Sequence, residues 1–345
     1  MEFADKRTPA HQRLYSELTL IRYPTAKFLA LLVCLACACN APGALAQAWK
    51  PERPVELAVF AAAGGGNDKA ARFIQKIWHD NRLLEAVVVN KVGGGGSLAY
   101  TYVSQKADGH SIGIAQAGLL TNQLTGRSPL SVADLTVLPY IGTEPVALAV
   151  KADSPYRNLR EFMDQLKKDP ASLSISVGST LGAVNHFTIA LLAKAAGVDP
   201  KKLKILVFGG GAESVTNLLG GHIDAMAQAS NNAVPHYQAG KMRILGLSTP
   251  KRAASLPDVP TFREQGYNVT IDGWYVFVGP KNMTPAQVAF WDGVFAKTVQ
   301  TDEWKKFVET TGWELGYKNS QETAAYLRKE YDEAKAILTE LGLAR

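Results

Sequence analysis

Cysteine is scarce in this sequence, and its position removes it from the functional argument. The chain has three cysteines, Cys34, Cys37 and Cys39, and all three lie in one apolar stretch near its start. If that stretch is removed, the remaining chain has no thiol nucleophile, no cysteine metal ligand and no disulfide. A domain of this length can bury enough apolar surface to fold in an oxidising compartment without disulfides.

The apolar stretch has the order of a secretory signal peptide. Lys27 precedes an apolar run over residues 28–39, which is shorter than a membrane-spanning helix needs to be. The small-residue sequence Ala44-Leu45-Ala46 then matches a cleavage site, so we expect a lead over residues 1–46 and an exported, periplasmic protein that starts at Gln47. No cysteine combines a leucine three residues earlier with small residues between, which disfavours a lipid-modified N-terminus.

Several motifs of nucleotide, metal and nucleic-acid chemistry are also missing. Neither Gly64-x-Gly66 nor Gly209-x-Gly211 continues to the third glycine of the dinucleotide fingerprint, and no G-x-x-x-x-G-K-[ST] occurs. The histidines after the lead are dispersed, so we expect no metal site and no cofactor. The formal net charge is +6, but the basic residues are scattered along the chain, which disfavours a nucleic-acid partner.

Apolar runs and helical stretches alternate after residue 50. The runs predict strands at Val55–Phe60, Ala86–Val92, Ser111–Ala115, Val146–Val150, Leu173–Val177, Lys204–Phe208, Ile223–Ala227, Ile244–Ser248 and Tyr275–Val278. Helices are predicted at about Lys69–Asn81, Leu98–Ala107, Leu159–Lys168, Val184–Ala196, Ser214–Gly220, Asn232–Ala239, Pro285–Gln300, Glu303–Thr311 and Gln321–Leu341. Such alternation favours an α/β protein with parallel sheets covered by helices on both faces, and the length suits two domains.

Glycine is abundant where the predicted strands end. In VELAVFAAAGGGNDKAAR, residues 55–72, an apolar strand passes through a glycine turn into the start of a helix. A turn of that shape leaves backbone N–H groups free at the start of the helix, where an anion can bind. Further glycine turns follow strands at 93–96, 178–182 and 209–211. Because ligands of open α/β sheets bind outside the carboxyl ends of strands, these turns predict a shared ligand cleft.

One motif supports a different class of protein. Gly95-Gly96-Ser97-Leu98-Ala99 resembles the G-x-S-x-G nucleophile elbow, so the alternative is a secreted serine hydrolase that uses Ser97 with His222 or His236. Serine at such a turn is more commonly a helix N-cap, and no acid stands out as a triad partner. We therefore interpret Ser97 as a cap and the protein as a non-enzyme.

Two further residues have ordinary structural interpretations. His186 lies early in a predicted helix, where a histidine more often packs or forms hydrogen bonds than acts as a base. Trp274 follows Asp272-Gly273 at the start of a strand and suits either the core or the wall of a pocket.

Several segments of the sequence, taken in their order along the chain, resemble the extracytoplasmic receptors of tripartite tricarboxylate transporters, the Bug or TctC-type solute-binding proteins. The resemblance covers essentially the whole mature chain and is closest to the tricarboxylate-binding branch. Its segments are Gly64–Asp68, Asn90 with Gly93–Gly96, Ala107–Gly109, Lys151–Tyr156, Gly178–His186, Gly209–Ala212 with Leu218–His222, Ala239–Lys241, and Leu256–Thr261 with Glu264–Tyr267. Together, in this spacing, they form a specific pattern.

The resemblance implies the fold of a type II periplasmic binding protein. That fold has two doubly wound α/β domains joined by two crossover strands, with the ligand in the cleft between them. Here it implies one domain of residues 47–149 plus 271–345 and a second of residues 150–270. It also implies a monomer that binds a small di-, tri- or aromatic carboxylate and delivers it to the membrane permease subunits of the transporter.

The resemblance also assigns candidate ligand-binding residues. The first strand–helix loop and a facing loop of the second domain hold the carboxylate in such receptors, often through bridging waters. The candidate set is Gly64, Gly65, Gly66, Asn67, Asp68, Gln116, Ser179, Thr180, Asn185, Gly211, Ala212, Ser230 and Trp274. Three positions depart from the family pattern: Ala61–Ala63 replace the usual prolines, Asn67 replaces an aromatic residue or threonine, and the common lysine near Gly209 is absent.

Overall fold

The computed structural model describes residues 49–178, 181–340 and 342–345. The predicted signal peptide and its cleavage site lie outside the described residues, as do Ser179, Thr180 and residue 341. Residues Trp49–Arg345 form one compact unit. Among the described residues, no helix is both long enough and apolar enough to cross a lipid bilayer.

In the described part of the chain, ten strands form the sheet structure, and they divide into two groups that share one long strand. The strands are β1 Val55–Val59, β2 Ala86–Asn90, β3 Ser111–Ala115, β4 Thr136–Lys151, β5 Ser174–Ser176, β6 Lys204–Leu206, β7 Ala225–Ala229, β8 Met242–Leu247, β9 Asp272–Gly279 and β10 Glu314–Lys318. The order along the main path is β2-β1-β3-β9-β4-β7-β5-β6, and β8 and β10 also pair with β4.

Strand β4 belongs to both groups. Its first part pairs antiparallel with β9, from Thr136 opposite Gly279 to Pro145 opposite Asp272, and also with β10. Its second part, from Val146 onward, pairs antiparallel with β7 and β8. We call the part of the unit built on β1, β2, β3, β9 and β10 lobe 1, and the part built on β5, β6, β7 and β8 lobe 2. The domain boundaries expected from the sequence stay a prediction.

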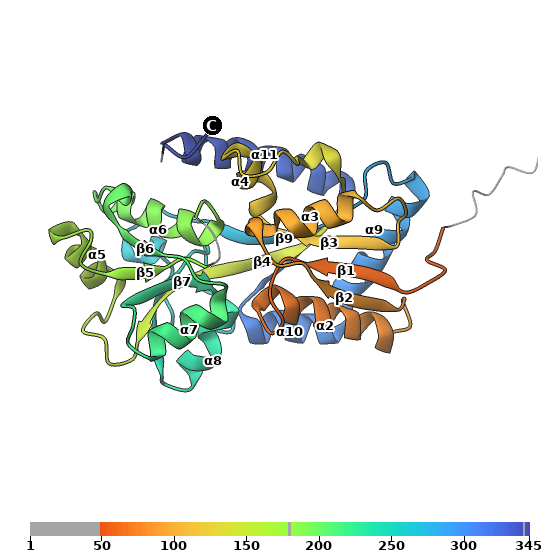
Figure 1. Cartoon of the computed structure of the whole chain (residues 1–345). Helices are drawn as coiled ribbons and strands as arrows, with labels where there is room; N and C mark the ends of the chain where they lie inside the picture. Colours follow the sequence, from red (N-terminus) through yellow and green to blue (C-terminus); the bar gives the residue numbers. More distant parts are fainter. Residues whose placement is uncertain (1–48, 179–180, 341) are drawn as a thin grey trace, which may run out of the picture. The chain divides into compact units, whose positions relative to one another are not determined.

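Among the described residues, ten α-helices cover the two groups of strands. They are α2 Gly66–Asp80, α3 Ser97–Ser104, α4 Gly118–Leu124, α5 Leu159–Lys168, α6 Val184–Ala195, α7 Gly211–Leu219, α8 Ser230–Gln238, α9 Pro285–Gln300, α10 Asp302–Thr311 and α11 Ser320–Glu340. In lobe 1, α2, α9 and α10 pack together on one side, and α3, α4 and α11 lie on the other (Figure 1). In lobe 2, α5 and α6 share one apolar cluster with the strands, and α7 and α8 share another.

Several helix ends are fixed by local side chains. The Asn158 side chain accepts a hydrogen bond from the Glu161 N–H at the start of α5. Thr284 and Gln287 form a reciprocal capping box at the start of α9, with Pro285 in the first turn. Gly312 ends α10 in the left-handed region, at φ 78°, which glycine adopts without strain.

The core of lobe 1 is rich in tryptophan. Trp78, Trp291 and Trp304 are fully buried in one apolar cluster that also contains Phe295. Burial would leave the indole N–H of Trp78 without a partner, but it donates to the Thr298 hydroxyl at 2.8 Å. This hydrogen bond joins α2 to α9 across a sequence separation of 220 residues.

We expect Thr298→Val to destabilise the protein by about 1 to 3 kcal/mol, because the buried Trp78 N–H would lose its acceptor. Urea unfolding followed by fluorescence measures the change. Thr310→Val is the matched control, since Thr310 is exposed on α10 and should change stability by less than about 0.5 kcal/mol. Equal stability of the two variants would contradict a stabilising role for the indole hydrogen bond.

The fold confirms the predicted α/β class and corrects several details. The sheet is mixed rather than parallel, because β4, β8, β9 and β10 enter it antiparallel. The sequence interpretation missed α4, β10 and the first ten residues of β4. Almost every residue of α4 is buried, so it lacks the polar face that gives helical periodicity. Pro139 and the register shifts around Gly142 obscure the strand pattern in β4.

Candidate ligand-binding site

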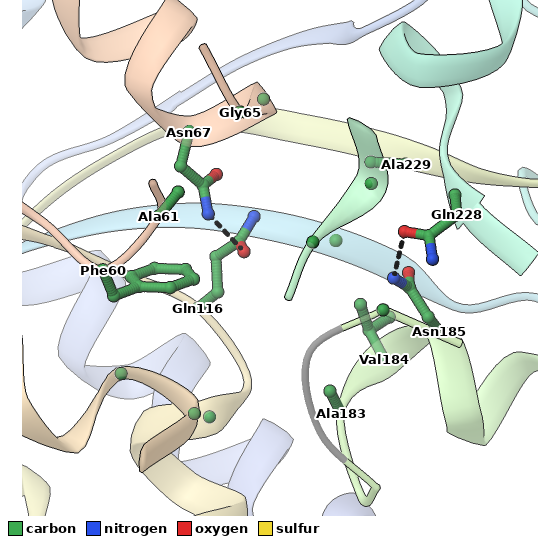
Figure 2. Close-up of a pocket in the computed structure, with 18 of the residues that line it drawn as sticks. Phe60, Ala61, Gly65, Asn67, Gln116, Ala183, Val184, Asn185, Gln228 and Ala229 are labelled. Atoms are coloured by element: carbon green, nitrogen blue, oxygen red, sulfur yellow. Dashed lines mark hydrogen bonds between the residues drawn. The ribbon is translucent and has the colours of Figure 1, made fainter. Parts of the chain in front are cut away.

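A cavity of about 520 Å³ lies where the carboxyl ends of the strands meet. Its walls come from the segments that follow β1, β2 and β3 in lobe 1 and β5, β6 and β7 in lobe 2. Residues of β4 and β9, where the two strands pair between the lobes, complete the lining. Figure 2 shows the two walls facing each other across this space. The cavity therefore occupies the position that the glycine turns predicted for a cleft.

The turn after β1 brings the start of α2 to the cavity. Gly65 is the N-cap of α2, and Gly65, Gly66 and Asn67 line the cavity. Gly64 has φ 80°, which lets the chain turn sharply before the helix. The free N–H groups of the first helical turn are therefore next to the cavity.

Asp68 stabilises this turn through hydrogen bonds but does not itself line the cavity. Its carboxylate accepts hydrogen bonds from the Gly64 N–H at 2.8 Å, the Arg72 Nε at 2.9 Å and the Asn90 side-chain amide at 2.8 Å. Burial by itself raises the pKa of Asp68, but the hydrogen bonds and the Arg72 charge outweigh it, so the pKa lies below its usual value. Asp68 thus positions the turn rather than contacting a ligand.

A second wall of lobe 1 is the glycine segment 93–96. All four glycines have positive φ, which only glycine adopts freely. Asn122 of α4 fixes the segment, because its side-chain amide donates to the carbonyl oxygens of Gly94 and Gly95, each at 3.0 Å. The segment is therefore held in place by a side chain from the next helix.

Ser97 is not the N-cap that the sequence indicated. The N-cap of α3 is Gly96, and Ser97 is already helical, so its hydroxyl makes no capping hydrogen bond. The Ser97 hydroxyl accepts instead from Asn122 at 3.1 Å. Within the described residues, Ser97 has no hydrogen bond to a histidine or a carboxylate, so the partners that a hydrolase needs are not joined to it.

Two pairs of side-chain amides face each other across the cavity (Figure 2). On the lobe 1 side, the Asn67 amide donates to Gln116 Oε1 at 3.2 Å. On the lobe 2 side, the Asn185 amide donates to Gln228 Oε1, also at 3.2 Å. These four residues offer both donors and acceptors to a ligand, and none of them carries a charge.

Two serines behind the wall fix the amide of Gln228. Its Nε2 donates to Ser214 Oγ at 3.0 Å and lies 3.4 Å from Ser176 Oγ. The two hydroxyls are 2.6 Å apart and buried. Because the nitrogen faces the serines, the oxygen of Gln228 faces Asn185.

A buried carboxyl group, Glu144 of β4, lies at the junction of the lobes and lines the cavity. Its exposed fraction is 1 %, its Oε2 accepts from the Tyr275 hydroxyl at 2.8 Å, and its Oε1 accepts from the Asn231 N–H at 3.2 Å. Burial raises the pKa of Glu144 to about 7, although these hydrogen bonds act in the opposite direction.

The charges of the cavity are unusual for an anion site. Glu144 and Glu213 are acidic, and the described residues that line the cavity include no lysine, arginine or histidine. An anion would therefore be held by backbone N–H groups, amide side chains and helix N-termini. Across the described residues, no group of three or more His, Cys, Asp or Glu side chains could hold a metal ion.

The structure separates the candidate residues into those that line the cavity and those that do not. Seven line it: Gly65, Gly66, Asn67, Gln116, Asn185, Gly211 and Ala212. Four do not: Gly64, Asp68, Ser230 and Trp274. Ser179 and Thr180 lie outside the described residues.

The positions of Ser230 and Trp274 have clear physical reasons. Ser230 is fully buried, and its hydroxyl donates to the Thr311 carbonyl at 3.2 Å, which joins the start of α8 to α10. Trp274 packs in an apolar cluster with Leu327 of α11, and its indole N–H donates to Glu330 at 3.0 Å. Of the two interpretations left open for Trp274, the core position is the one observed.

His186 has the hydrogen-bonding role that the sequence indicated. Its Nδ1 accepts from the Gly182 N–H at 3.0 Å, inside the turn that leads into α6. Burial and the nearby Arg127 lower the pKa of His186 to about 4, so the ring is neutral at pH 7.

The sequence interpretation missed Glu144, Gln228 and Tyr275, which all line the cavity. Each lies within a strand, and Gln228 and Tyr275 have apolar neighbours on both sides, so their pattern is that of core residues. A charged residue inside an otherwise apolar strand was the one available signal for Glu144, since carboxylates are rarely buried without a reason.

Comparisons with known proteins agree with this architecture. A UPF0065 protein from the gbd 5′ region of Cupriavidus necator is 30% identical over 309 residues, which cover 88% of this chain and 92% of that protein. The solved structure of the periplasmic binding protein BugD has a TM-score of 0.78 at 24% identity and covers 86% of this chain and 99% of that one.

Two Rhodopseudomonas palustris proteins share the fold at 24% identity, each covering 85% of this chain and 99% of its own. One was solved with adipate and has a TM-score of 0.78; the other has bound malate and a TM-score of 0.74. These similarities confirm the expected periplasmic-binding-protein fold. Residues 71–343 match the family model described as tripartite tricarboxylate transporter family receptor, and the chain therefore belongs to this family of solute-binding receptors, as its sequence pattern indicated.

Proposed function

We propose that the protein is a periplasmic receptor that binds an organic carboxylate in the cavity between the lobes and delivers it to the membrane permease of a tripartite tricarboxylate transporter. Membership of the receptor family supports the general role. The observation that carries the ligand class is the convergence of helix starts on the cavity. Helices α2, α6 and α7 begin at residues that line it, and Ala229, the N-cap residue of α8, lines it as well. Because helix N-termini carry partial positive charge and free N–H groups, they bind carboxylates without an arginine.

The lining favours an acid with a single strongly held carboxylate and a polar or apolar body. Backbone N–H groups meet the carboxylate, and the amide pairs Asn67–Gln116 and Asn185–Gln228 meet the rest of the ligand. Malate and adipate, which accompany two structural relatives, are the first acids to test. Delivery to a permease requires release, and a site of neutral hydrogen bonds suits release better than a site of buried ion pairs.

The two walls of the cavity belong to different lobes, so binding should draw the lobes together. We place the hinge in the strands that join them, near Ala149 and Thr270. Gly66 already lies against lobe 2: a Cβ at this position would come within 2.9 Å of the Asn231 amide. The carboxylate clamp then consists of the β1–α2 turn on one side and the segment that leads into α6 on the other.

A thermal-shift panel of malate, adipate, citrate and benzoate on the chain starting at Gln47 tests this proposal. We expect at least one acid to raise the melting temperature, and calorimetry then gives its dissociation constant. If no acid binds and the protein instead cleaves a generic ester in a Ser97-dependent way, the receptor proposal is wrong.

Truncation of the lobe 2 amide gives a sharper result. We expect Asn185→Ala to weaken binding of the best acid by about 5- to 100-fold, because a polar group left without its partner in a buried site costs about 1 to 3 kcal/mol. Asn217→Ala on α7 is the control, because the Asn217 side-chain amide donates to the Glu213 carbonyl within the same helix and lies outside the cavity lining. Unchanged affinity in Asn185→Ala would show that the Asn185 amide does not contact the ligand.

A further inference from the structure

Glu144 is the one buried acid of the cavity lining, and its partners there are neutral. The Tyr275 hydroxyl and the Asn231 N–H donate to it, and it makes no ion pair among the described residues. Buried carboxylates are normally paired with a cation or neutralised by a proton. Glu144 therefore needs a second explanation beyond packing.

The elements around Glu144 bring no positive charge to it. Strand β9 contributes the phenol of Tyr275, and β10 contributes Glu314, whose strand partner is Thr143. Helix α7 contributes Glu213, which lines the same cavity, and α8 begins with the neutral residues 230–232. The cations in the first two turns of α2 are Lys69 and Arg72; neither lines the cavity, and Arg72 is paired with Asp68. The surroundings of Glu144 are thus neutral or acidic.

An organic anion bound in this cavity shares a poorly solvated space with the Glu144 carboxyl. Two negative charges in such a space repel strongly, and the usual outcome is that one of the two groups takes up a proton. We propose that Glu144 is a proton-carrying ligand contact, so that the receptor takes up one proton from solvent on the Glu144 carboxyl when it binds its organic anion. The neutral carboxyl then replaces a repulsive charge by a hydrogen-bond donor inside the cavity.

The free protein is already prepared for this step. Burial raises the pKa of Glu144 to about 7 before any anion is present, and a bound anion raises it further. Near neutral pH the free receptor is therefore partly ionised at Glu144 and the complex is protonated. The inference rests on the proposed function in one respect, namely that the ligand is an anion.

The first experiment measures proton uptake during binding. Malate, adipate, citrate and benzoate are titrated into the protein by calorimetry at about pH 7.5, in two buffers of different ionisation enthalpy. We expect an uptake of about three quarters of a proton per ligand, the fraction of Glu144 that is ionised in the free protein at this pH, and an affinity that falls by up to about tenfold per pH unit above the pKa of Glu144. In Glu144→Gln, which keeps the shape and the hydrogen-bonding capacity, both the uptake and the pH dependence should disappear.

Glu330→Gln is the matched control. Burial also raises the pKa of Glu330, and this carboxyl accepts a hydrogen bond from the Trp274 indole, but it lies outside the cavity lining. Proton uptake should be the same as in the parent protein. An acid that binds without proton uptake, or with proton release, overturns the inference and leaves the proposed function intact; failure of every acid to bind contradicts the proposed function instead.

A second measurement needs no ligand. Because the folded-state pKa of Glu144 lies above the unfolded value of 4.5, the folded protein keeps a proton that the unfolded chain loses. Stability should therefore fall as pH rises from about 4.5 to about 7, and this part of the pH dependence should be lost in Glu144→Gln. Tyr275→Phe removes a donor to the ionised carboxyl, so it should move the pH dependence upward. Identical profiles for the parent, Glu144→Gln and Tyr275→Phe would overturn the inference without reference to any ligand.

Discussion

Gly118→Ala should reduce ligand affinity by about 100-fold or more. A Cβ on Gly118 would lie 2.3 Å from the carbonyl oxygen of Gly95, a backbone atom that cannot rotate away. The glycine segment 93–96 would have to shift, and with it a whole wall of the cavity. The shifted segment would also lose the hydrogen bonds that the Asn122 side chain donates to the carbonyl oxygens of Gly94 and Gly95. Overpacking of this kind should lower the free energy of unfolding by about 1 to 3 kcal/mol.

Calorimetry with the acid found in the panel and urea unfolding separate the two effects. Gly293→Ala on α9 is the control, because a Cβ at Gly293 meets nothing within 4 Å and alanine favours a helix. That variant should bind like the parent and be slightly more stable. Parent-like affinity in Gly118→Ala would mean that the segment 93–96 has no part in binding.

Asp68→Ala should lower the free energy of unfolding by about 2 to 4 kcal/mol, since hydrogen bonds to a charged group contribute about 1.5 to 3 kcal/mol each. The change leaves the Gly64 N–H, Arg72 and the Asn90 amide without their shared acceptor. The β1–α2 turn would then lose its fixed shape, so affinity should fall as well, although Asp68 itself does not line the cavity. Denaturant unfolding and calorimetry measure the two losses.

The stability effect of Asp68 has a defined pH dependence. Its folded-state pKa is depressed, so its contribution is present above the unfolded pKa of about 3.9 and is lost as pH falls through the lower folded value. The difference between Asp68→Ala and the parent should therefore shrink in strong acid. Asp80→Ala, which removes an exposed acid from the same helix, should change stability by less than about 0.5 kcal/mol at any pH.

Much of the fold could be predicted because local patterns matched the final elements. Strand Ser111–Ala115 and helices Leu159–Lys168 and Pro285–Gln300 have the predicted bounds. Their apolar periodicity and their caps agree with their tertiary environment. Strand β10 could not be found in this way, since Glu314–Lys318 is short, has a glycine at its centre and gains its structure from pairing with β4.

The part of the site that is formed by backbone turns could be predicted from the sequence. Glycine turns mark the ends of strands, and these turns place Gly65, Gly66, Gly211 and Ala212 around one cavity. The residues that were missed owe their position to long-range pairing. Glu144 reaches the cavity because β4 passes between the lobes, and no local pattern of residues reveals that path.

Strand β4 also has a consequence for how the chain folds. All four of its partner strands, β7, β8, β9 and β10, come later in the sequence, and the last of them ends at Lys318. The first part of β4, whose partners are β9 and β10, therefore stays unpaired until at least Gly279 has left the ribosome. High sequence separation between contacting segments slows folding. A newly made chain with this topology should therefore stay unfolded for longer than its parallel βα units alone would require. A polypeptide can be threaded through a membrane pore only while it is unfolded.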